Sequence, residues 1–308
     1  MTDYIRSFCA EFDWPEEAAD AFVSAYEKIQ SVPAAKLLFD QQLNNYECLD
    51  TNAALAAVWP TSAKVAQLTG IISHTTDMVF AICLTKHMHE LYRQAGIPEQ
   101  NYRDSALDLR CKLYECKNVR KEWGSFVAPW FTGFYNMSLI GLGRLEFEYP
   151  HPIGDPDFAY ECDGRVYRTG DLCIGMHIPS SGPLDPEACM DSFRQAYRMF
   201  SPRFPEGRIP MICSSWLLFA EHEKFLPEHS RIRQFMKFFD IWESHDSPKF
   251  GDCWRIFGQG WRGSLEGFPR DTSLQRAYYD WIASGHEPGT GRGIFIFDGE
   301  NIRHGHLI

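Results

Sequence analysis

The chain has 308 residues, 44% hydrophobic and 23% charged, a composition typical of a folded globular protein rather than a disordered one. This length is enough for two domains of ordinary size or one large domain. The formal net charge of −11 argues against a general nucleic-acid binder.

The cysteines and the N-terminus bear on the compartment. The ten cysteines form no Cys-x-x-Cys pair, and most stand inside apolar runs, which is typical of reduced, buried thiols. The first residues, MTDYIRSFCAEFDW, do not combine a basic region with an apolar core, so no signal peptide is expected. No apolar run approaches the roughly 18 residues that a membrane span requires. We therefore expect a soluble, cytoplasmic protein.

Residues 1–122 are predicted to form an all-helical N-terminal domain. The sequence DWPE at 13–16 begins one helix. A long helix is predicted over 71–95, because apolar residues recur along one side and Gly-Ile-Pro at 96–98 ends it. Residues 104–116 are predicted to form another.

From residue 123 onward strands alternate with helices, and we expect residues 123–308 to form a second domain. Apolar and charged residues alternate over 144–149, which predicts a half-buried strand. An alternative assigns the strand at 140–149 to both domains. Asp-Gly at 163–164 predicts a hairpin over 158–169.

The centre of this second domain is predicted at residues 171–200. Residues 172–178 form a short, mostly apolar run of strand length, and DPE at 185–187 is a helix start signal with Asp at the N-cap and Pro at the first helical position. Such a strand–loop–helix unit is expected to point the free N–H groups of the helix at a phosphate or an oxyanion. The alternative is a plain crossover connection in an α/β sheet.

The rest of the second domain supplies further strands and helices. Strands are predicted over 209–219 and 252–258, helices over 230–239 and 272–284, and a hairpin over 293–308. The predicted fold class is therefore α/β (α+β), with an all-helical region followed by a mixed sheet that contains at least one parallel crossover.

Several segments in this order resemble a known family. They are GLGRLEFE at 141–148, MHIPSSGPL at 176–184, CSSWLL at 213–218, LPEHSRIRQF at 226–235, WRIFG at 254–258 and TSLQRAYYDWIASG at 272–285. The chain resembles bacterial acyltransferase-domain proteins that join a helical N-acyltransferase N-terminal region to a GNAT-like C-terminal domain.

The resemblance implies transfer of an acyl group from acyl-coenzyme A to a small-molecule amine, with no metal. It implies that the strands 171–178 and 209–219 splay around the thioester, and that the following loop holds the pyrophosphate. The implied coenzyme-binding residues are Ile178, Ser180, Ser181, Gly182, Leu184, Arg194, Ser230 and Arg231.

Two features depart from the family pattern. The loop PSSGPLD at 179–185 has one glycine where the superfamily has two spaced glycines, and its two prolines remove N–H donors. The helix predicted over 272–284 is an addition to the simplest layout.

Acyl transfer to an amine needs a base, an oxyanion donor and a proton source for the thiolate. His177 stands near the end of the central strand, and an unperturbed imidazole titrates near neutrality, so it is a candidate base. Glu146 and Glu148 share one face of their strand and are alternative bases. Ser214 and Ser215 are candidate donors to the oxyanion or the thiolate.

Other interpretations stay open at this point. His177 can be a structural strand-end histidine, and the two glutamates can be surface residues. Cys213 is a candidate nucleophile for a covalent route, although a cysteine in an apolar run is more often inert. The rival function is a non-catalytic protein on the same fold that binds an acyl chain or a small molecule.

Overall fold

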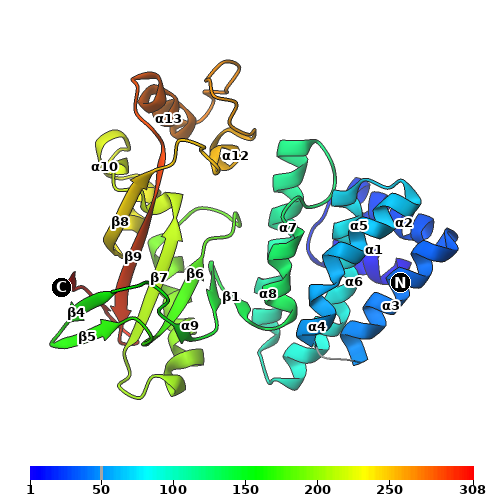
Figure 1. The fold of residues 1–308 in the computed structure, drawn as a ribbon, viewed down its shortest axis with the longest axis horizontal. Coiled ribbons are helices and arrows are strands. Elements are labelled where there is room, and N and C mark those ends of the chain that lie inside the picture. The colour runs from blue at the N-terminus through cyan, green and yellow to red at the C-terminus, as the bar shows by residue number, and fades with distance from the viewer. Residues whose placement is uncertain (49–50) are drawn as a thin grey trace. The chain divides into compact units, whose positions relative to one another are not determined.

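The computed structural model describes residues 1–48 and 51–308 (Figure 1). Its contacts divide the chain into two compact units, Met1–Gly141 and Leu142–Ile308. The boundary expected from the sequence at residues 122 and 123 stays a prediction. Within the described residues, no helix has the length and apolarity needed to cross a membrane.

The first unit is helical, as predicted. Its helices are α1 (Thr2–Glu11), α2 (Glu16–Ser31), α3 (Pro33–Cys48), α4 (Thr51–Ala56), α5 (Val58–Thr69), α6 (Ser73–Gln94), α7 (Glu99–Arg120), the 3₁₀ helix η1 (Ala128–Phe131) and α8 (Thr132–Tyr135). The long predicted helix is α6, which is buried continuously from Met78 to Thr85 and packs against α2, α3, α5 and α7. Gly96, with φ of +69°, follows its end, as the sequence indicates.

The second unit carries most of the strands. They are β1 (Leu139–Leu142), which spans the division between the units, β2 (Leu145–Glu148), β3 (His151–Pro152), β4 (Ala159–Cys162), β5 (Arg165–Arg168), β6 (Leu172–His177), β7 (Ile209–Ser215), β8 (Asp240–Asp246), β9 (Gly289–Phe297), β10 (Ile302–Arg303) and β11 (His306–Leu307). Its helices are α9 (Pro186–Phe200), η2 (Ser201–Arg203), η3 (Trp216–Leu218), α10 (His222–Phe225), α11 (Arg231–Met236), α12 (Cys253–Phe257) and α13 (Ser273–Ala283).

The main sheet has eight strands and is mixed. In the second unit its path runs β2-β6-β7-β9-β10, with β3 added on β6 and β8 on β9. β6 and β7 are parallel and are connected through α9, which is the crossover predicted from the sequence, whereas β9 runs antiparallel to β7. The fold class is therefore α+β, as expected.

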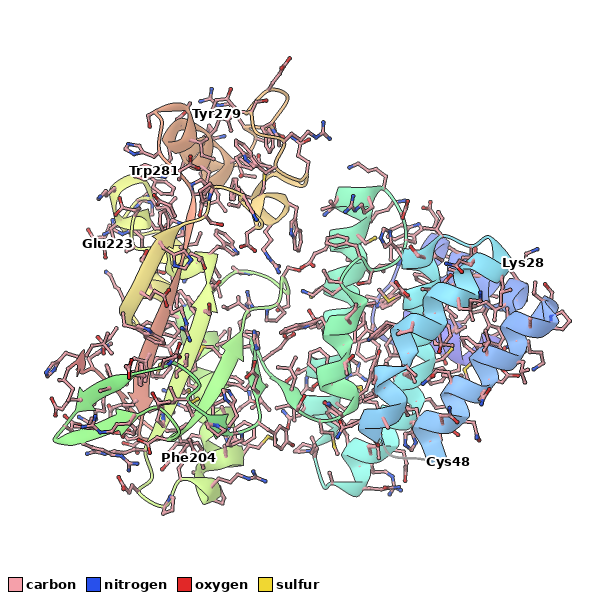
Figure 2. All side chains as sticks on the ribbon, viewed as in Figure 1. Lys28, Cys48, Phe204, Glu223, Tyr279 and Trp281 are labelled. Carbon is pink, nitrogen blue, oxygen red and sulfur yellow. The ribbon has the colours of Figure 1, made fainter. Side chains whose placement is uncertain are left out.

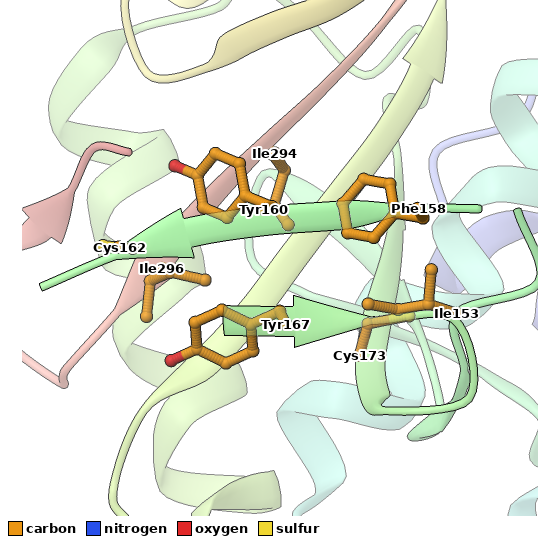
Figure 3. Packing of buried hydrophobic residues seen from close by; sticks show 8 residues of the cluster. All are labelled: Ile153, Phe158, Tyr160, Cys162, Tyr167, Cys173, Ile294 and Ile296. Atoms are coloured by element: carbon orange, nitrogen blue, oxygen red, sulfur yellow. The ribbon is translucent and has the colours of Figure 1, made fainter. Parts of the chain in front are cut away.

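The two faces of this sheet are covered differently. On one face α9 packs its apolar side against β9, with the Phe193 and Phe295 rings 4.9 Å apart. On the other face the β4–β5 hairpin covers β6 and β9, and Tyr160 and Tyr167 form a cluster with Cys173 and the isoleucines of β9 (Figure 3). The predicted turn at Asp163 and Gly164 closes this hairpin, because both residues adopt positive φ.

Three elements differ from the sequence prediction. The strand predicted over 209–219 ends at Ser215, and Trp216–Leu218 form η3. Residues 252–258 were predicted to form a strand, and this is wrong: residues 253–257 form α12, whose buried residues Cys253, Ile256 and Phe257 follow helical spacing and whose end is capped by Gly258 at φ +69°. β8 was not predicted, because four of its seven residues are exposed and its sequence, DIWESHD, lacks clear alternation.

The segment between β8 and β9 contains α12 and α13 and has an aromatic core of its own. Phe250, Phe257 and Phe268 pack there with Tyr278 of α13. Phe225 of α10 stacks on Trp281 of α13 with centroids 4.7 Å apart. Figure 2 labels Trp281 and its neighbour Tyr279 on α13. His222, fully buried, places Nε2 2.5 Å from the Tyr278 hydroxyl.

The buried His222 predicts an acid-sensitive step in stability. Burial lowers its pKa to about 4, whereas an unfolded histidine titrates near about 6.5. Because the unfolded chain takes up this proton first, stability is expected to fall by up to about 3 kcal/mol as pH drops from about 6.5 to 4. Urea unfolding across this range should show the slope in the native chain and in His229→Gln, an exposed control, and lose it in His222→Gln. An unchanged slope in His222→Gln would contradict the assignment.

Candidate active site

The candidate base and both candidate glutamates lie on neighbouring strands. β2 and β6 are antiparallel, with Glu146 directly across from His177 and Phe147 across from Met176. Since side chains alternate along a strand, Glu148 and His177 share the sheet face that carries Cys173, opposite α9. Glu146 is 2% exposed, whereas the side chains of His177 and Glu148 are 31% and 39% exposed.

Glu148 bridges two histidines across β6. Its Oε1 lies 2.7 Å from His177 Nε2, and its Oε2 lies 2.8 Å from His151 Nε2. The carboxylate lies over Gly175, where a Cβ would stand 2.7 Å from Glu148 Oε2 and 2.8 Å from Cδ. Only a glycine at this position leaves room for the carboxylate between the two imidazoles.

The charges of this cluster follow from the contacts. The close contact with the His151 imidazole and then the hydrogen bond with His177 hold the pKa of Glu148 well below its usual range. The Cys173 thiol and then the Glu148 carboxylate raise the pKa of His151 to about 10. Near neutral pH Glu148 is therefore an anion and His151 a cation. With His177 Nε2 donating to Glu148, its Nδ1 is the nitrogen that can accept a proton.

The parallel strands beside His177 stop pairing before they end. The register of β6 with β7 runs from Ile174↔Met211 to Met176↔Cys213, whereas β7 stays paired with β9 as far as Ser215↔Gly291. His177 and Ser214 are the next residues along each strand. Ser214 is exposed and lies across from Arg292 of β9 on the face of His177.

The remaining candidates on β7 have local roles. Ser215 Oγ accepts from the backbone N–H of Leu217 at 3.2 Å and so begins η3. Cys213 is 1% exposed, and burial raises the pKa of its thiol to about 12. Since the thiolate is the nucleophile, this environment does not favour a covalent route through Cys213.

Arg144 organises the loop after β6. Its guanidinium donates to the carbonyl oxygens of Pro179 at 3.0 Å, Gly182 at 2.8 Å and Pro183 at 3.0 Å. The loop bends at Gly182, whose φ of +140° suits glycine. In the sequence Arg144 is one charged residue of the predicted strand over 144–149, and nothing in its local pattern indicates contacts 35 to 39 residues away.

The N-terminus of α9 is not open, contrary to the expectation from the sequence. Asp185 Oδ1 accepts from the backbone N–H groups of Glu187 at 3.1 Å and Ala188 at 3.4 Å. Its Oδ2 lies 3.1 Å from Arg231 of α11, an ion pair between exposed side chains. The aspartate that signals the start of α9 in the sequence thus occupies the backbone N–H donors of the first turn of this helix. An anion bound here has to use the loop backbone or displace this carboxylate.

The other expected coenzyme residues lie on the loop after β6, on α9 and at the start of α11. Ser180, Ser181 and Gly182 are exposed in the loop, Ile178 is half-buried and Leu184 is buried. Ser230 Oγ caps α11 by accepting from the N–H of Arg233 at 3.3 Å. Arg194 is half-buried further along α9. Across residues 1–48 and 51–308, no group of three or more His, Cys, Asp or Glu side chains is arranged to hold a metal ion.

Two family models match the chain in succession. Residues 3–137 match the N-acyltransferase N-terminal domain, and residues 139–295 match the GNAT-like C-terminal domain. No curated protein matches the sequence.

Solved structures share the fold at low identity. An acyltransferase mutant in complex with octanoyl-CoA superposes with a TM-score of 0.69 at 21% identity, covering 95% of this chain and 87% of that chain. An acyltransferase in complex with decanoyl-CoA and teicoplanin superposes with a TM-score of 0.60 at 18% identity, covering 94% of this chain and 98% of that chain. The chain therefore belongs to the GNAT-like C-terminal domain family, as an acyltransferase in which that domain follows an N-acyltransferase N-terminal domain.

Proposed function

We propose that the chain is an acyl-coenzyme A-dependent N-acyltransferase that acylates the amine of a small molecule by direct attack. The observation that carries this proposal is the His177–Glu148 pair at the end of β6, beside the point where β6 and β7 stop pairing. The N-acyltransferase domain model, and the octanoyl-CoA, decanoyl-CoA and teicoplanin bound to the similar structures, support the donor and acceptor classes.

In the proposed reaction the acceptor nitrogen attacks the thioester carbonyl carbon. His177 Nδ1 takes the proton that the amine loses, while Glu148 holds the opposite side of the imidazole. The C–S bond then breaks, and the coenzyme leaves as a thiolate that takes up a proton. Ser214, exposed on the face of His177, is the proposed donor to the oxyanion or the thiolate. Glu146, buried across from His177, is the alternative base.

The proposed coenzyme site is the loop after β6 with the adjoining ends of α9 and α11. Ser180, Ser181 and Gly182 lie on the exposed part of this loop, and Arg144 fixes its carbonyl oxygens. Arg231, whose guanidinium pairs with Asp185 at the start of α9, is a proposed cation for a phosphate.

Arg144→Ala is expected to weaken coenzyme binding more than the chemical step. Losing three donated hydrogen bonds, each worth about 1 kcal/mol, leaves the loop carbonyls unordered. We expect KM for acyl-CoA to rise about tenfold or more, with kcat within about threefold. Steady-state kinetics of Arg144→Ala beside Arg198→Ala, an exposed arginine of α9, tests this. Equal KM values for the two variants would remove the assigned role.

The proposed function itself is tested by product formation. The chain is incubated with octanoyl-CoA or decanoyl-CoA and a panel of small-molecule amines, and free thiol and acylated amine are quantified by mass spectrometry. Thiol release matched by acyl-amide formation supports the proposal. Tight binding of acyl-CoA without turnover on any amine would contradict it and favour a binding protein.

A further inference from the structure

A second histidine shares the carboxylate that holds His177. The antiparallel register of β3 with β6 places His151 across from Cys173. His151 Nε2 lies 2.8 Å from one oxygen of Glu148, and His177 Nε2 lies 2.7 Å from the other. Each carboxylate oxygen therefore meets one imidazole.

The opposite side of the His151 ring is also surrounded by acceptors. Its Nδ1 lies 3.1 Å from the carbonyl oxygen of Pro152 and 3.8 Å from Cys173 Sγ. With an acceptor at both ring nitrogens, the doubly protonated imidazolium fits this place best. The raised pKa of His151, about 10, agrees with that geometry. Its side chain is 41% exposed, so the position tolerates substitution.

We propose that His151 is a positioning residue that keeps the Glu148 carboxylate aimed at His177 and offsets its negative charge. An uncompensated carboxylate stabilises a protonated imidazole beside it. The His151 cation opposes that effect, so more His177 stays neutral and able to accept a proton. The role of His177 as base rests on the proposed function, whereas the three-residue geometry does not.

Other titratable or charged groups on this sheet face are the same in every variant to be compared. On β2 the group is Glu146, on β6 it is Cys173, and on β9 it is Arg292, which is paired with Asp155 and Glu243. Their contribution to the electrostatic environment of His177 therefore cancels when variants of His151 are compared with the native chain.

The test compares His151→Gln, which keeps an N–H donor without charge, with His151→Lys, which keeps the charge. His89→Gln is the matched control, because His89 Nε2 lies 2.7 Å from Glu99 in an exposed pair of the first unit. The titration of the His177 imidazole is followed by NMR, with His177→Gln for assignment. In His151→Gln we expect its midpoint to rise by about 0.5–1 pH unit, and the acid limb of kcat/KM to move with it. His151→Lys and His89→Gln should stay near the native value.

A native midpoint in His151→Gln would overturn the inference, even if activity falls. The NMR readout needs no turnover, so it decides the role of His151 even if the native chain transfers no acyl group and the proposed function fails. Conversely, an active enzyme with a native midpoint in His151→Gln rejects the inference and leaves the function intact. If His151→Gln does not fold, His151→Asn makes the same comparison.

Discussion

Replacing His177 with alanine is expected to lower kcat by about two to four orders of magnitude. In the proposed reaction the imidazole at the end of β6 takes the amine proton, and its Nε2 is held 2.7 Å from Glu148 Oε1. The side chain is 31% exposed, so its loss should leave the fold and the KM for acyl-CoA nearly unchanged. Single-turnover kinetics with saturating donor separates this loss of chemistry from a loss of binding.

Two comparisons make the His177 experiment decisive. If Glu148 acts through His177, the double variant His177→Ala, Glu148→Ala should be no slower than His177→Ala alone, because residues of one catalytic unit are not additive. Glu146→Gln tests the alternative base on β2. A fall in kcat for Glu146→Gln, with His177→Ala close to native, would transfer the role from the histidine to the glutamate.

Gly175→Ala is expected to lower kcat by about 10²-fold. A Cβ at this position would stand 2.7 Å from Glu148 Oε2 and 2.8 Å from Cδ, so the carboxylate has to leave its place between His151 and His177. Displacing a positioning group by about 1 Å can cost this much in rate. The measurement is kcat with octanoyl-CoA, alongside a thermal unfolding curve.

Gly260→Ala is the matched control, because a Cβ there meets nothing within 4 Å. Shortening the acid in the double variant Gly175→Ala, Glu148→Asp should recover part of the activity by giving the new methyl group space. Native kcat in Gly175→Ala would show that catalysis does not depend on the Glu148 position.

Local signals made much of the fold predictable. The Asp-Gly turn at 163–164 and the Asp185 N-cap each act within a few residues, and each is present. α12 was missed because five residues of CWRIF are too short for periodicity to separate a strand from a helix. Asp185 also shows a limit of such signals. A correctly predicted helix start does not reveal that the N-cap carboxylate occupies the N–H groups that a bound anion would use.

The candidate site was less predictable, because strand register assembles it. His177 and Glu148 were separate candidates for the base in the sequence, and the pairing of β2 with β6 places them 2.7 Å apart. No local signal points to His151, since its link to Glu148 depends on β3 pairing with β6. Arg144 reaches a loop 35 to 39 residues away, a contact that no local pattern encodes.

The most direct test of the account is isothermal titration of the chain with acetyl-, octanoyl- and decanoyl-CoA, with free coenzyme A and ATP as controls. We expect saturable one-site binding of at least one acyl-CoA, tighter than that of free coenzyme A, because the acyl chain adds buried apolar surface. ATP should bind at least tenfold more weakly than that acyl-CoA, a difference of about 1.4 kcal/mol. The absence of binding by every acyl-CoA would contradict the account.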